Sequence, residues 1–318
     1  MMQTEKRQTM KRVFIDGKAG TTGLRIYERL GGRTDIEMIT IPEAYRKDEK
    51  ARREAINRAD VAFLCLPDAA AREAVAMVDN PDTVIIDTST AHRTDDGWAY
   101  GFPELAGCRE KIKNSKRIAN PGCHATGFIA LVEPLVRNGL VSPDISLSAF
   151  SLTGYSGGGK KMISEYEDGG NVISGLMAGG RQYALGQKHK HLPEIVKLCA
   201  LSAAPAFCPI VVPHHSGMEV TVPVFAKDLK GTIEDVKNLY RSGYASGLVH
   251  FVENADENGF MSSAKLAGKD TLEVSVYGND ERILLVSRFD NLGKGASGAA
   301  IQNMNIVLGV AEDTGLSV

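Results

Sequence analysis

Hydrophobic residues in the first third of the chain fall in short, nearly continuous runs separated by stretches with helical spacing. Four runs rich in Val, Ile, Phe and Leu are predicted as strands: 12–17, 36–41, 61–66 and 83–88. Such runs are typical of strands buried on both faces of a parallel sheet. The stretches between them are rich in Ala, Arg, Glu and Leu and predict helices over 21–30, 48–58 and 69–78. This alternation indicates a doubly wound, Rossmann-like α/β fold.

The pattern changes after residue 123. A helix is predicted over 124–138, ended by Gly139 and kinked in its second half by Pro134. The later apolar runs predict strands of a largely antiparallel or mixed sheet, an α+β arrangement, over 145–153, 211–212, 218–225, 271–277 and 281–289. The turn sequence 278–280 joins the last two as a hairpin. The segment 296–310 is apolar at helical spacing, and we expect it to pack back on the first part of the chain.

Composition narrows the class of protein. The formal net charge is −2 and no long basic run occurs, so the chain has no electrostatic footprint for nucleic acid. No apolar stretch approaches the roughly 18 residues of a membrane span, and residues 1–11 are polar and lack the apolar core of a secretory signal. We therefore expect a soluble, cytoplasmic protein whose first ten or so residues form a loose tail.

The cysteines are odd in number and dispersed without a Cys-x-x-Cys spacing: Cys65, Cys108, Cys123, Cys199 and Cys208. This arrangement argues against a disulfide framework and against a zinc site. Free thiols in a reducing compartment, and no metal, are expected.

A glycine-rich segment, FIDGKAGTTGLRI, follows the first predicted strand and opens the first helix. Its glycines would let backbone N–H groups approach a pyrophosphate at the helix N-terminus, where the helix dipole favours negative charge. An ordinary tight turn is the alternative. Because the segment lies at the first strand–helix junction, we predict dinucleotide binding by Gly17, Ala19, Gly20, Thr21, Thr22 and Gly23.

The tip of the second strand bears on the choice of nicotinamide cofactor. NAD-binding proteins tend to place an acidic residue there to hold the ribose 2′-hydroxyl. Here the strand ends Thr40-Ile41-Pro42 without an acid, and Arg46 follows closely, which favours a 2′-phosphate and hence NADP(H). Glu43, an acidic residue that follows the strand, instead favours NAD(H).

Cys123 lies in the segment NPGCHATG, between a Pro-Gly turn and a predicted helix start. A thiolate at the first turn of a helix is favoured by the helix dipole, which lowers the pKa of the thiol and enriches its nucleophilic form. Taken alone, the segment favours a buried structural cysteine. The surrounding segments decide between the two.

Three further segments are TGYSGGGKK (153–161), HKHLPEI (189–195) and DNLGKGASGAAIQNMN (290–305). Together with NPGCHATG, FIDGKAGTTG, CLPDAAAREAV and STAHR, they resemble the N-acetyl-gamma-glutamyl-phosphate reductase family in its shorter bacterial form, over nearly the whole chain from residue 12. That family is related to aspartate-semialdehyde dehydrogenase and to phosphorylating glyceraldehyde-phosphate dehydrogenase.

The resemblance implies that Cys123 attacks an acyl phosphate, expels phosphate and forms a thioacyl enzyme that hydride from NADPH reduces to an aldehyde. One departure is His124, where the family often has Tyr; this side chain either adds a nearby cation or fills space. The general acid/base is expected to be a histidine of HKHLPEI. We assign His191, with His189 as the alternative or as a substrate contact, and interpret His214-His215 as a surface or interface turn.

The resemblance and the strand-end geometry add further contacts. Besides the glycine loop and Arg46, cofactor contacts are predicted for Cys65, Leu66, Pro67, Ser89, Gly157, Gly158, Asn291 and Gly295. Substrate contacts are predicted for Asn120, Ser156, Lys160, Arg93 and Arg181. Either arginine could hold the leaving phosphate or a substrate carboxylate.

These expectations combine into a dinucleotide-binding domain, 11–122, completed by a C-terminal helix within 292–318, and a catalytic and oligomerisation domain, 123–291. The resemblance implies a homotetramer, with a homodimer as the alternative, that uses an exposed face of the second sheet. Aspartate-semialdehyde dehydrogenase is the competing enzymatic function. A dinucleotide-binding redox sensor without catalysis is the competing class.

Overall fold

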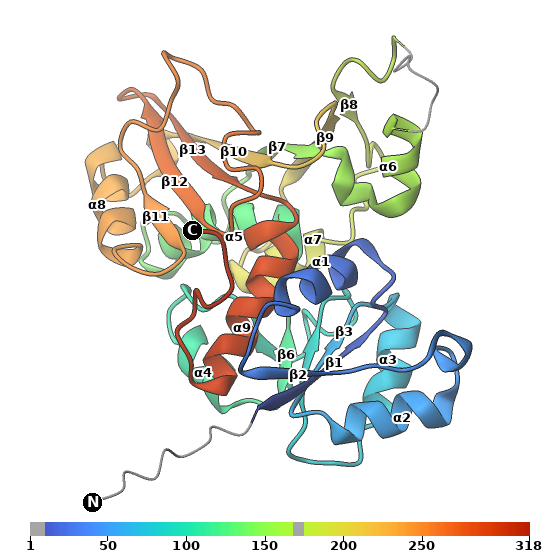
Figure 1. Cartoon of the computed structure of the whole chain (residues 1–318). Coiled ribbons are helices and arrows are strands. Elements are labelled where there is room, and N and C mark those ends of the chain that lie inside the picture. Colours follow the sequence, from blue (N-terminus) through green and yellow to red (C-terminus); the bar gives the residue numbers. More distant parts are fainter. Residues whose placement is uncertain (1–9, 168–174) are drawn as a thin grey trace, which may run out of the picture.

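Two β-sheets organise the protein in this computed structural model, which describes residues 10–167 and 175–318. Figure 1 shows the sheet built from the first part of the chain below and the second sheet above, with helices α5 (Cys123–Arg137) and α9 (Gly298–Leu308) between them. The predicted N-terminal tail lies outside the described residues, apart from Met10 and Lys11.

The first sheet contains six strands, all parallel, in the order β2-β1-β3-β4-β6-β5. Its strands are β1 (Lys11–Asp16), β2 (Ile36–Ile39), β3 (Val61–Leu64), β4 (Val84–Asp87), β5 (Ala99–Tyr100) and β6 (Arg117–Ala119). Its helices are α1 (Thr21–Leu30), α2 (Glu49–Arg58), α3 (Asp68–Ala76) and α4 (Cys108–Asn114). The predicted doubly wound fold is confirmed, although β5, α4 and β6 were not predicted.

Alternation along β1 explains why helices cover both faces of this sheet. Val13 belongs to a core shared with α1 and α9, whereas Phe14 belongs to a core shared with α2 and α3. On the first face, Ile301 and Met304 of α9 are fully buried. The C-terminal segment therefore packs back on the first sheet, as its apolar pattern predicts.

The second sheet is mixed and has seven strands in the order β11-β12-β13-β10-β7-β9-β8. They are β7 (Ser148–Gly154), β8 (Arg181–Gln182), β9 (Ala206–Val212), β10 (Met218–Phe225), β11 (Val249–Phe251), β12 (Leu272–Gly278) and β13 (Arg282–Phe289). The β12–β13 hairpin forms as predicted, with Gly278 at a φ of 123°. The pairs β11–β12 and β7–β9 are parallel and the others antiparallel.

Helix α5 crosses this second sheet and begins at Cys123, one residue before the predicted start. It continues through Pro134 to Arg137. Proline lacks the N–H that would reach the carbonyl four residues earlier, and the Tyr244 hydroxyl donates to that Ala130 carbonyl instead, at 2.6 Å. Pro134 therefore does not end the helix.

Three helices of the second part were not predicted: α6 (Gly159–Glu167), α7 (Leu192–Leu198) and α8 (Ile233–Gly243). The glycine-rich loop expected after β7 is in fact a short 3-10 turn, η2 (Tyr155–Gly158), that leads directly into α6. Within the described ranges, no helix combines the length and apolar character needed to cross a bilayer.

Candidate active site

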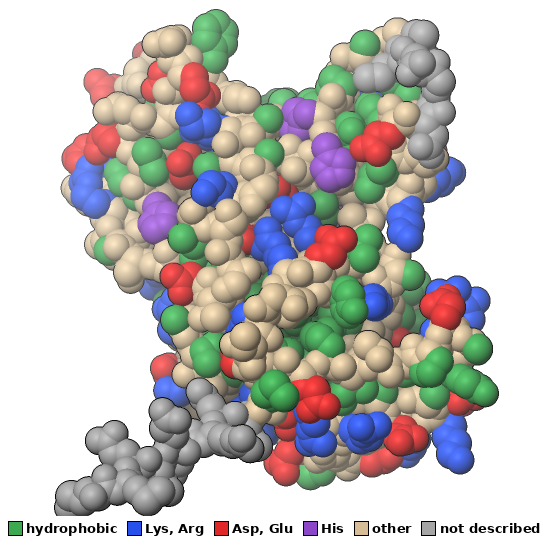
Figure 2. Space-filling view, viewed as in Figure 1, with side chains coloured by type: hydrophobic (Ala, Val, Ile, Leu, Met, Phe, Trp, Pro, Cys, Tyr) green, Lys and Arg blue, Asp and Glu red, His purple; other side chains and the backbone are tan. Residues whose placement is uncertain are grey.

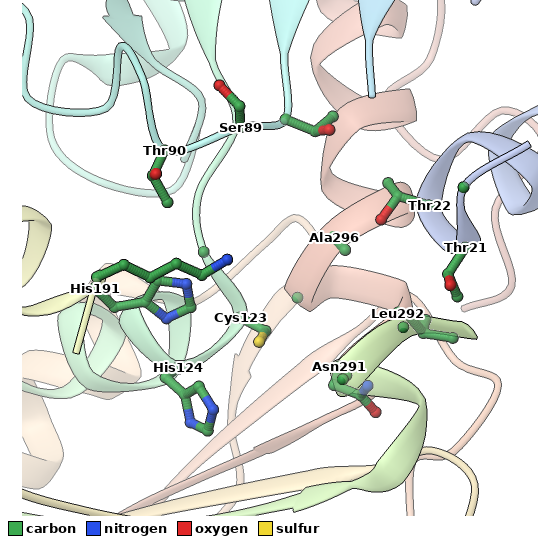
Figure 3. A pocket seen from close by; sticks show the side chains of 18 of the residues that line it. Thr21, Thr22, Ser89, Thr90, Cys123, His124, His191, Asn291, Leu292 and Ala296 are labelled. Atoms are coloured by element: carbon green, nitrogen blue, oxygen red, sulfur yellow. The ribbon is translucent and has the colours of Figure 1, made fainter. Parts of the chain in front are cut away.

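A cleft of about 500 Å³ lies where the two sheets meet, and we call it the reaction cleft. Its walls come from the start of α1, the loops after β3 and β4, the start of α5, residues 189–191, and the segment that precedes α9. Figure 3 shows Cys123, His124 and His191 on one side of this hollow and Thr21, Thr22 and Asn291 on the other. Acidic and basic side chains are interspersed on the face shown in Figure 2.

The glycine loop fits a pyrophosphate. A Cβ on Gly17, whose φ is 84°, would collide with the Cys65 carbonyl, and a Cβ on Gly23 would lie 2.6 Å from the Gly17 oxygen. Helix α1 begins at the N-cap Gly20 with neither a side-chain cap nor an acid in its first turn. Its first N–H groups are therefore available to an anion at the dipole's positive end.

A second cavity of about 500 Å³, the adjoining groove, continues from the glycine loop toward the tip of β2. Gly17, Ala19, Leu66 and Arg46 line it. Arg46 is ion-paired with Glu43 at 2.6 Å, and both side chains are largely exposed. Together the cleft and the groove offer a nicotinamide dinucleotide the N–H groups at the start of α1 and the Arg46 guanidinium.

Cys123 is the first residue of α5, at the carboxyl end of the first sheet. The N-cap Gly122 offers no side-chain acceptor to the helix. Segment η4 (Gly293–Ser297), a single π-helical turn before α9, approaches so closely that a Cβ on Gly295 would lie 3.0 Å from the Cys123 Cβ. Glycine at this position therefore lets η4 close the cleft beside the thiol.

The electrostatics of Cys123 differ from the expectation. Burial raises the pKa of the thiol. This effect outweighs the lowering of the pKa by the Arg93 guanidinium, the backbone N–H of His124 and Lys190. The predicted depression of the pKa is therefore wrong for the protein without ligands, because desolvation of the thiolate exceeds the benefit of the helix N-terminus. The thiol is neutral and needs a base to become nucleophilic.

A buried carboxylate holds the turn before Cys123. Glu194 Oε1 accepts the Gly122 N–H at 2.9 Å and the Tyr100 hydroxyl at 2.6 Å, while Oε2 accepts Arg93 Nη1 at 3.2 Å. Arg93 also donates to the carbonyls of Asn120 and Thr88, each at 2.9 Å. Arg93 lines the cleft, but the structure uses three of its donors to fix the turn. Sequence reasoning did not identify Glu194, although it lies within HKHLPEI.

His191 and His189 also line the cleft. A Cβ on Gly122 would lie 2.5 Å from His191 Nε2, so this imidazole lies against the residue preceding Cys123. Burial and Arg93 hold the pKa of His191 well below its usual value, and burial and Lys190 lower that of His189 to about 4. Both rings are therefore neutral and can accept a proton. No cluster suited to a metal ion occurs among the described residues.

His124 points into the same region from α5. Burial lowers its pKa to about 3, with smaller contributions from His189 and Lys190. The ring therefore supplies no cation. Its nitrogens lie 2.7 Å from the Ser151 and Tyr183 hydroxyl oxygens.

Two predicted amides brace η4 and the glycine-rich turn. Asn120 donates to the Ala296 carbonyl at 3.0 Å, and Asn291 donates to the Ser156 hydroxyl at 3.0 Å. Their Oδ1 atoms accept from Asn303 and from the Gly217 N–H. The side chains of Asn120, Asn291, Ser156 and Asn303 are buried, so their hydrogen bonds fix the shape of the cleft wall.

The other predicted site residues divide into two groups. The reaction cleft is lined by Gly20, Thr21, Thr22, Gly23, Cys65, Leu66, Pro67, Ser89, Gly157, Gly158, Asn291 and Gly295. Lys160 and Arg181 do not line it: Lys160 is exposed on α6, and Arg181 donates to the Tyr166 hydroxyl at 3.0 Å. The cleft instead contains Lys190, Tyr183, Thr88 and Thr90, which were not predicted.

Of the other cysteines, Cys65 lines the cleft, whereas the His214-His215 pair lies outside its lining. Cys108 begins α4, Cys199 is buried, and burial raises the pKa of Cys65 to about 12. His214 lies in the turn between β9 and β10, where its Nε2 is 2.9 Å from the Ser263 hydroxyl.

Comparison with known protein families matches both parts of the chain. Residues 34–115 match the family described as "Semialdehyde dehydrogenase, NAD binding domain". Residues 123–291 match the one described as "Semialdehyde dehydrogenase, dimerisation domain".

Relatives of similar length carry one enzyme name. N-acetyl-gamma-glutamyl-phosphate reductase 2 of Pseudomonas putida is 43% identical over 95% of this chain and 98% of its own. N-acetyl-gamma-glutamyl-phosphate reductase of Brucella anthropi is 45% identical over 94% of this chain and 98% of its own.

Solved structures share the fold at low identity. Aspartate semialdehyde dehydrogenase II of Vibrio cholerae, complexed with ASA, aligns with a TM-score of 0.72 at 18% identity over 94% of this chain and 98% of its own. Aspartate semialdehyde dehydrogenase of Candida albicans, with NADP, aligns with a TM-score of 0.63 at 16% identity over 94% and 99%.

Proposed function

The chain belongs to the N-acetyl-gamma-glutamyl-phosphate reductase family of oxidoreductases, and we propose that it reduces N-acetyl-gamma-glutamyl phosphate to N-acetylglutamate 5-semialdehyde with NADPH, a step of arginine biosynthesis. The observation that carries this proposal is the position of Cys123, at a helix N-terminus on the same cleft as the glycine loop. Aspartate semialdehyde is the weaker substrate candidate, because those enzymes are only 18% identical or less among the structures compared.

The chemistry starts with a neutral thiol beside neutral imidazoles. His191 accepts the proton as Cys123 Sγ bonds to the acyl carbon, and the bond from that carbon to the phosphate oxygen breaks; the leaving phosphate takes up a proton from solvent. A bound nicotinamide dinucleotide supplies the hydride that reduces the resulting thioester. The carbon–sulfur bond then breaks, the aldehyde leaves, and His191 returns the proton to the thiolate. Lys190 at the cleft wall is suited to the negative charge of the substrate.

The cofactor proposal assigns each end of the dinucleotide to described residues. The N–H groups at the start of α1 hold the pyrophosphate, and Gly157, Gly158 and Gly295 border the nicotinamide. Arg46 leaves its ion pair with Glu43 to hold the 2′-phosphate that distinguishes NADPH from NADH. The exposure of both partners makes this exchange inexpensive.

Assembly and location are also part of the proposal. We propose a cytoplasmic homotetramer, or a homodimer, formed through the outer face of the mixed sheet, where Phe150 and Leu284 are exposed. The match of residues 123–291 to a dimerisation domain supports this surface. We propose two domains: a dinucleotide-binding domain, 11–122, completed by 292–318, and a catalytic and oligomerisation domain, 123–291.

An assay in the reverse direction tests the function. Purified protein is supplied with N-acetylglutamate semialdehyde, phosphate and NADP⁺, and NADPH is measured. Turnover should stop when phosphate is omitted and resume with arsenate, because the thioester needs an oxyanion nucleophile. Aspartate semialdehyde in the same assay measures the alternative substrate. A redox sensor without catalysis would bind the dinucleotide yet turn over neither aldehyde.

A further inference from the structure

A buried hydrogen-bond chain leads from the core to the reaction cleft through His124. Its Nδ1 lies 2.7 Å from the hydroxyl of Ser151 on β7, and its Nε2 lies 2.7 Å from the hydroxyl of Tyr183. Ser151 is fully buried and His124 is 3% exposed, whereas Tyr183 is partly exposed and lines the cleft. The proposed mechanism does not use this chain.

The donor and acceptor roles along this series of hydrogen bonds follow from the hydroxyl hydrogen of Ser151. Within the described residues, the partner recorded for its hydroxyl is His124 Nδ1. A buried hydroxyl hydrogen without an acceptor is costly, whereas an unused lone pair is tolerated more readily. Ser151 therefore donates to Nδ1, and the neutral ring must carry its proton on Nε2.

The second half of the chain follows from this tautomer. Nε2–H donates to the Tyr183 oxygen, so the Tyr183 hydroxyl hydrogen cannot be used toward His124. It is therefore free for an acceptor in the cleft, which Tyr183 lines together with Cys123. The opposite direction would leave the Ser151 hydrogen without an acceptor in the core.

We propose that Tyr183, oriented by the Ser151–His124 pair, is a substrate-binding residue that donates its hydroxyl hydrogen to a carbonyl or carboxylate oxygen of the acyl substrate. His124 is accordingly a positioning residue. These hydrogen bonds make the Tyr183 hydroxyl a donor toward the cleft. The cleft therefore selects a substrate that has a hydrogen-bond acceptor next to Tyr183. This inference rests on the proposed function for its substrate, but the polarity of the chain is a property of the protein alone.

Nitrogen-15 NMR of the unliganded protein tests the polarity without any activity. Histidine-labelled protein is compared with His124→Asn to assign the two ring nitrogens of His124. A protonated Nε2 and an unprotonated Nδ1 are expected in the wild type. The reverse tautomer, or a protonated ring at pH 7, would overturn the proposal whether or not the protein is a reductase.

Kinetics of Tyr183→Phe test the substrate contact. Loss of one hydrogen bond should raise KM for the acyl substrate or its semialdehyde roughly three- to tenfold, with a smaller change in kcat and none in KM for NADP⁺. Tyr166→Phe, which removes a hydrogen-bonded hydroxyl outside the cleft, is the matched control and should behave as wild type. An unchanged substrate KM, or a fall in kcat larger than the rise in KM, would overturn the contact. Absence of turnover in the wild type would instead refute the proposed function.

Discussion

The reaction cleft and the adjoining groove each hold an ion pair of an arginine with a glutamate, but the two pairs differ in their exposure to water. Around Cys123, the ion pair of Arg93 with Glu194 is almost fully buried, with side chains 7% and 2% exposed. At the far end of the groove, Arg46 and Glu43 form an ion pair whose side chains are 49% and 83% exposed. The first pair is sheltered from water, and the second is largely exposed to it.

This difference determines what each pair can do. Buried charges are costly to leave without a partner, so the Arg93–Glu194 pair holds the turn before Cys123 in one conformation. Exposed pairs contribute little to stability and exchange partners easily, so the Arg46–Glu43 pair can open for a ligand. Substitutions in the cleft should therefore have large effects on chemistry and stability, and substitutions in the groove should have small effects confined to cofactor choice.

Cys123→Ser should give the largest effect. The serine hydroxyl lacks the nucleophilicity of the thiol, and the raised thiol pKa shows that the site does not stabilise an anion at this position without help. We expect kcat to fall at least about 10³-fold while the fold is retained. The reverse-direction assay measures kcat, and circular dichroism checks the fold.

Cys208→Ser is the control, because this partly exposed thiol lies on β9 and is not part of the lining of the cleft. Its activity should be close to that of the wild type. Mass spectrometry of protein incubated with acyl substrate and no NADPH should find the acyl group on Cys123. An adduct on another residue, or full activity in Cys123→Ser, would refute the thioacyl mechanism.

His191→Asn should lower kcat by roughly 10²- to 10⁴-fold, the contribution of a general acid or base. The substrate KM should change much less, because the imidazole moves a proton rather than holding the substrate. His189→Asn is the paired variant and should retain more activity. If the large loss follows His189→Asn and His191→Asn remains near normal, the assignment within the pair is wrong.

Glu194→Gln should destabilise the protein. The amide keeps the side-chain size, but it leaves the buried Arg93 guanidinium without its counter-charge, a change that costs about 3–5 kcal/mol. Thermal unfolding should show a clear decrease in Tm. Glu253→Gln removes an exposed partner of Lys237 and Arg241 and should leave Tm nearly unchanged. Equal decreases in the two variants would contradict the contrast between buried and exposed pairs.

Sequence patterns predicted the fold best where burial alternates regularly. The prediction for β10 has the observed bounds, Met218–Phe225, and its residues alternate between buried and more exposed positions. The prediction for α1 is equally close. In contrast, only the last two residues of β9 were predicted, because Pro209 interrupts the pattern. Helix α8 had an unused signal: Thr232 and Asp235 form a capping box at its start.

The sequence indicated the candidate site residues that lie within single motifs, but not the contacts between residues far apart in the sequence. Cys123, His189 and His191 line one cleft, as their motifs indicate. Glu194 was missed because its role depends on Tyr100 and Arg93, which are 94 and 101 residues away in the chain. The raised pKa of Cys123 was missed for a related reason: a helix start is visible in the sequence, whereas the burial that outweighs it is created by packing.

Arg46→Gln should give the smallest effect and bears on cofactor choice alone. A charge-assisted hydrogen bond to the 2′-phosphate contributes about 1.5 kcal/mol at the lower end of its range, which suits an exposed side chain and corresponds to roughly tenfold in kcat/KM for NADPH. Activity with NADH should stay the same, since NADH carries no such phosphate. Glu43→Gln provides the opposite change: it releases Arg46 from its ion pair and should raise kcat/KM for NADPH slightly. Equal use of NADPH and NADH by the wild type, or an equal loss with both cofactors in Arg46→Gln, would show that the groove does not read the 2′-phosphate through this residue.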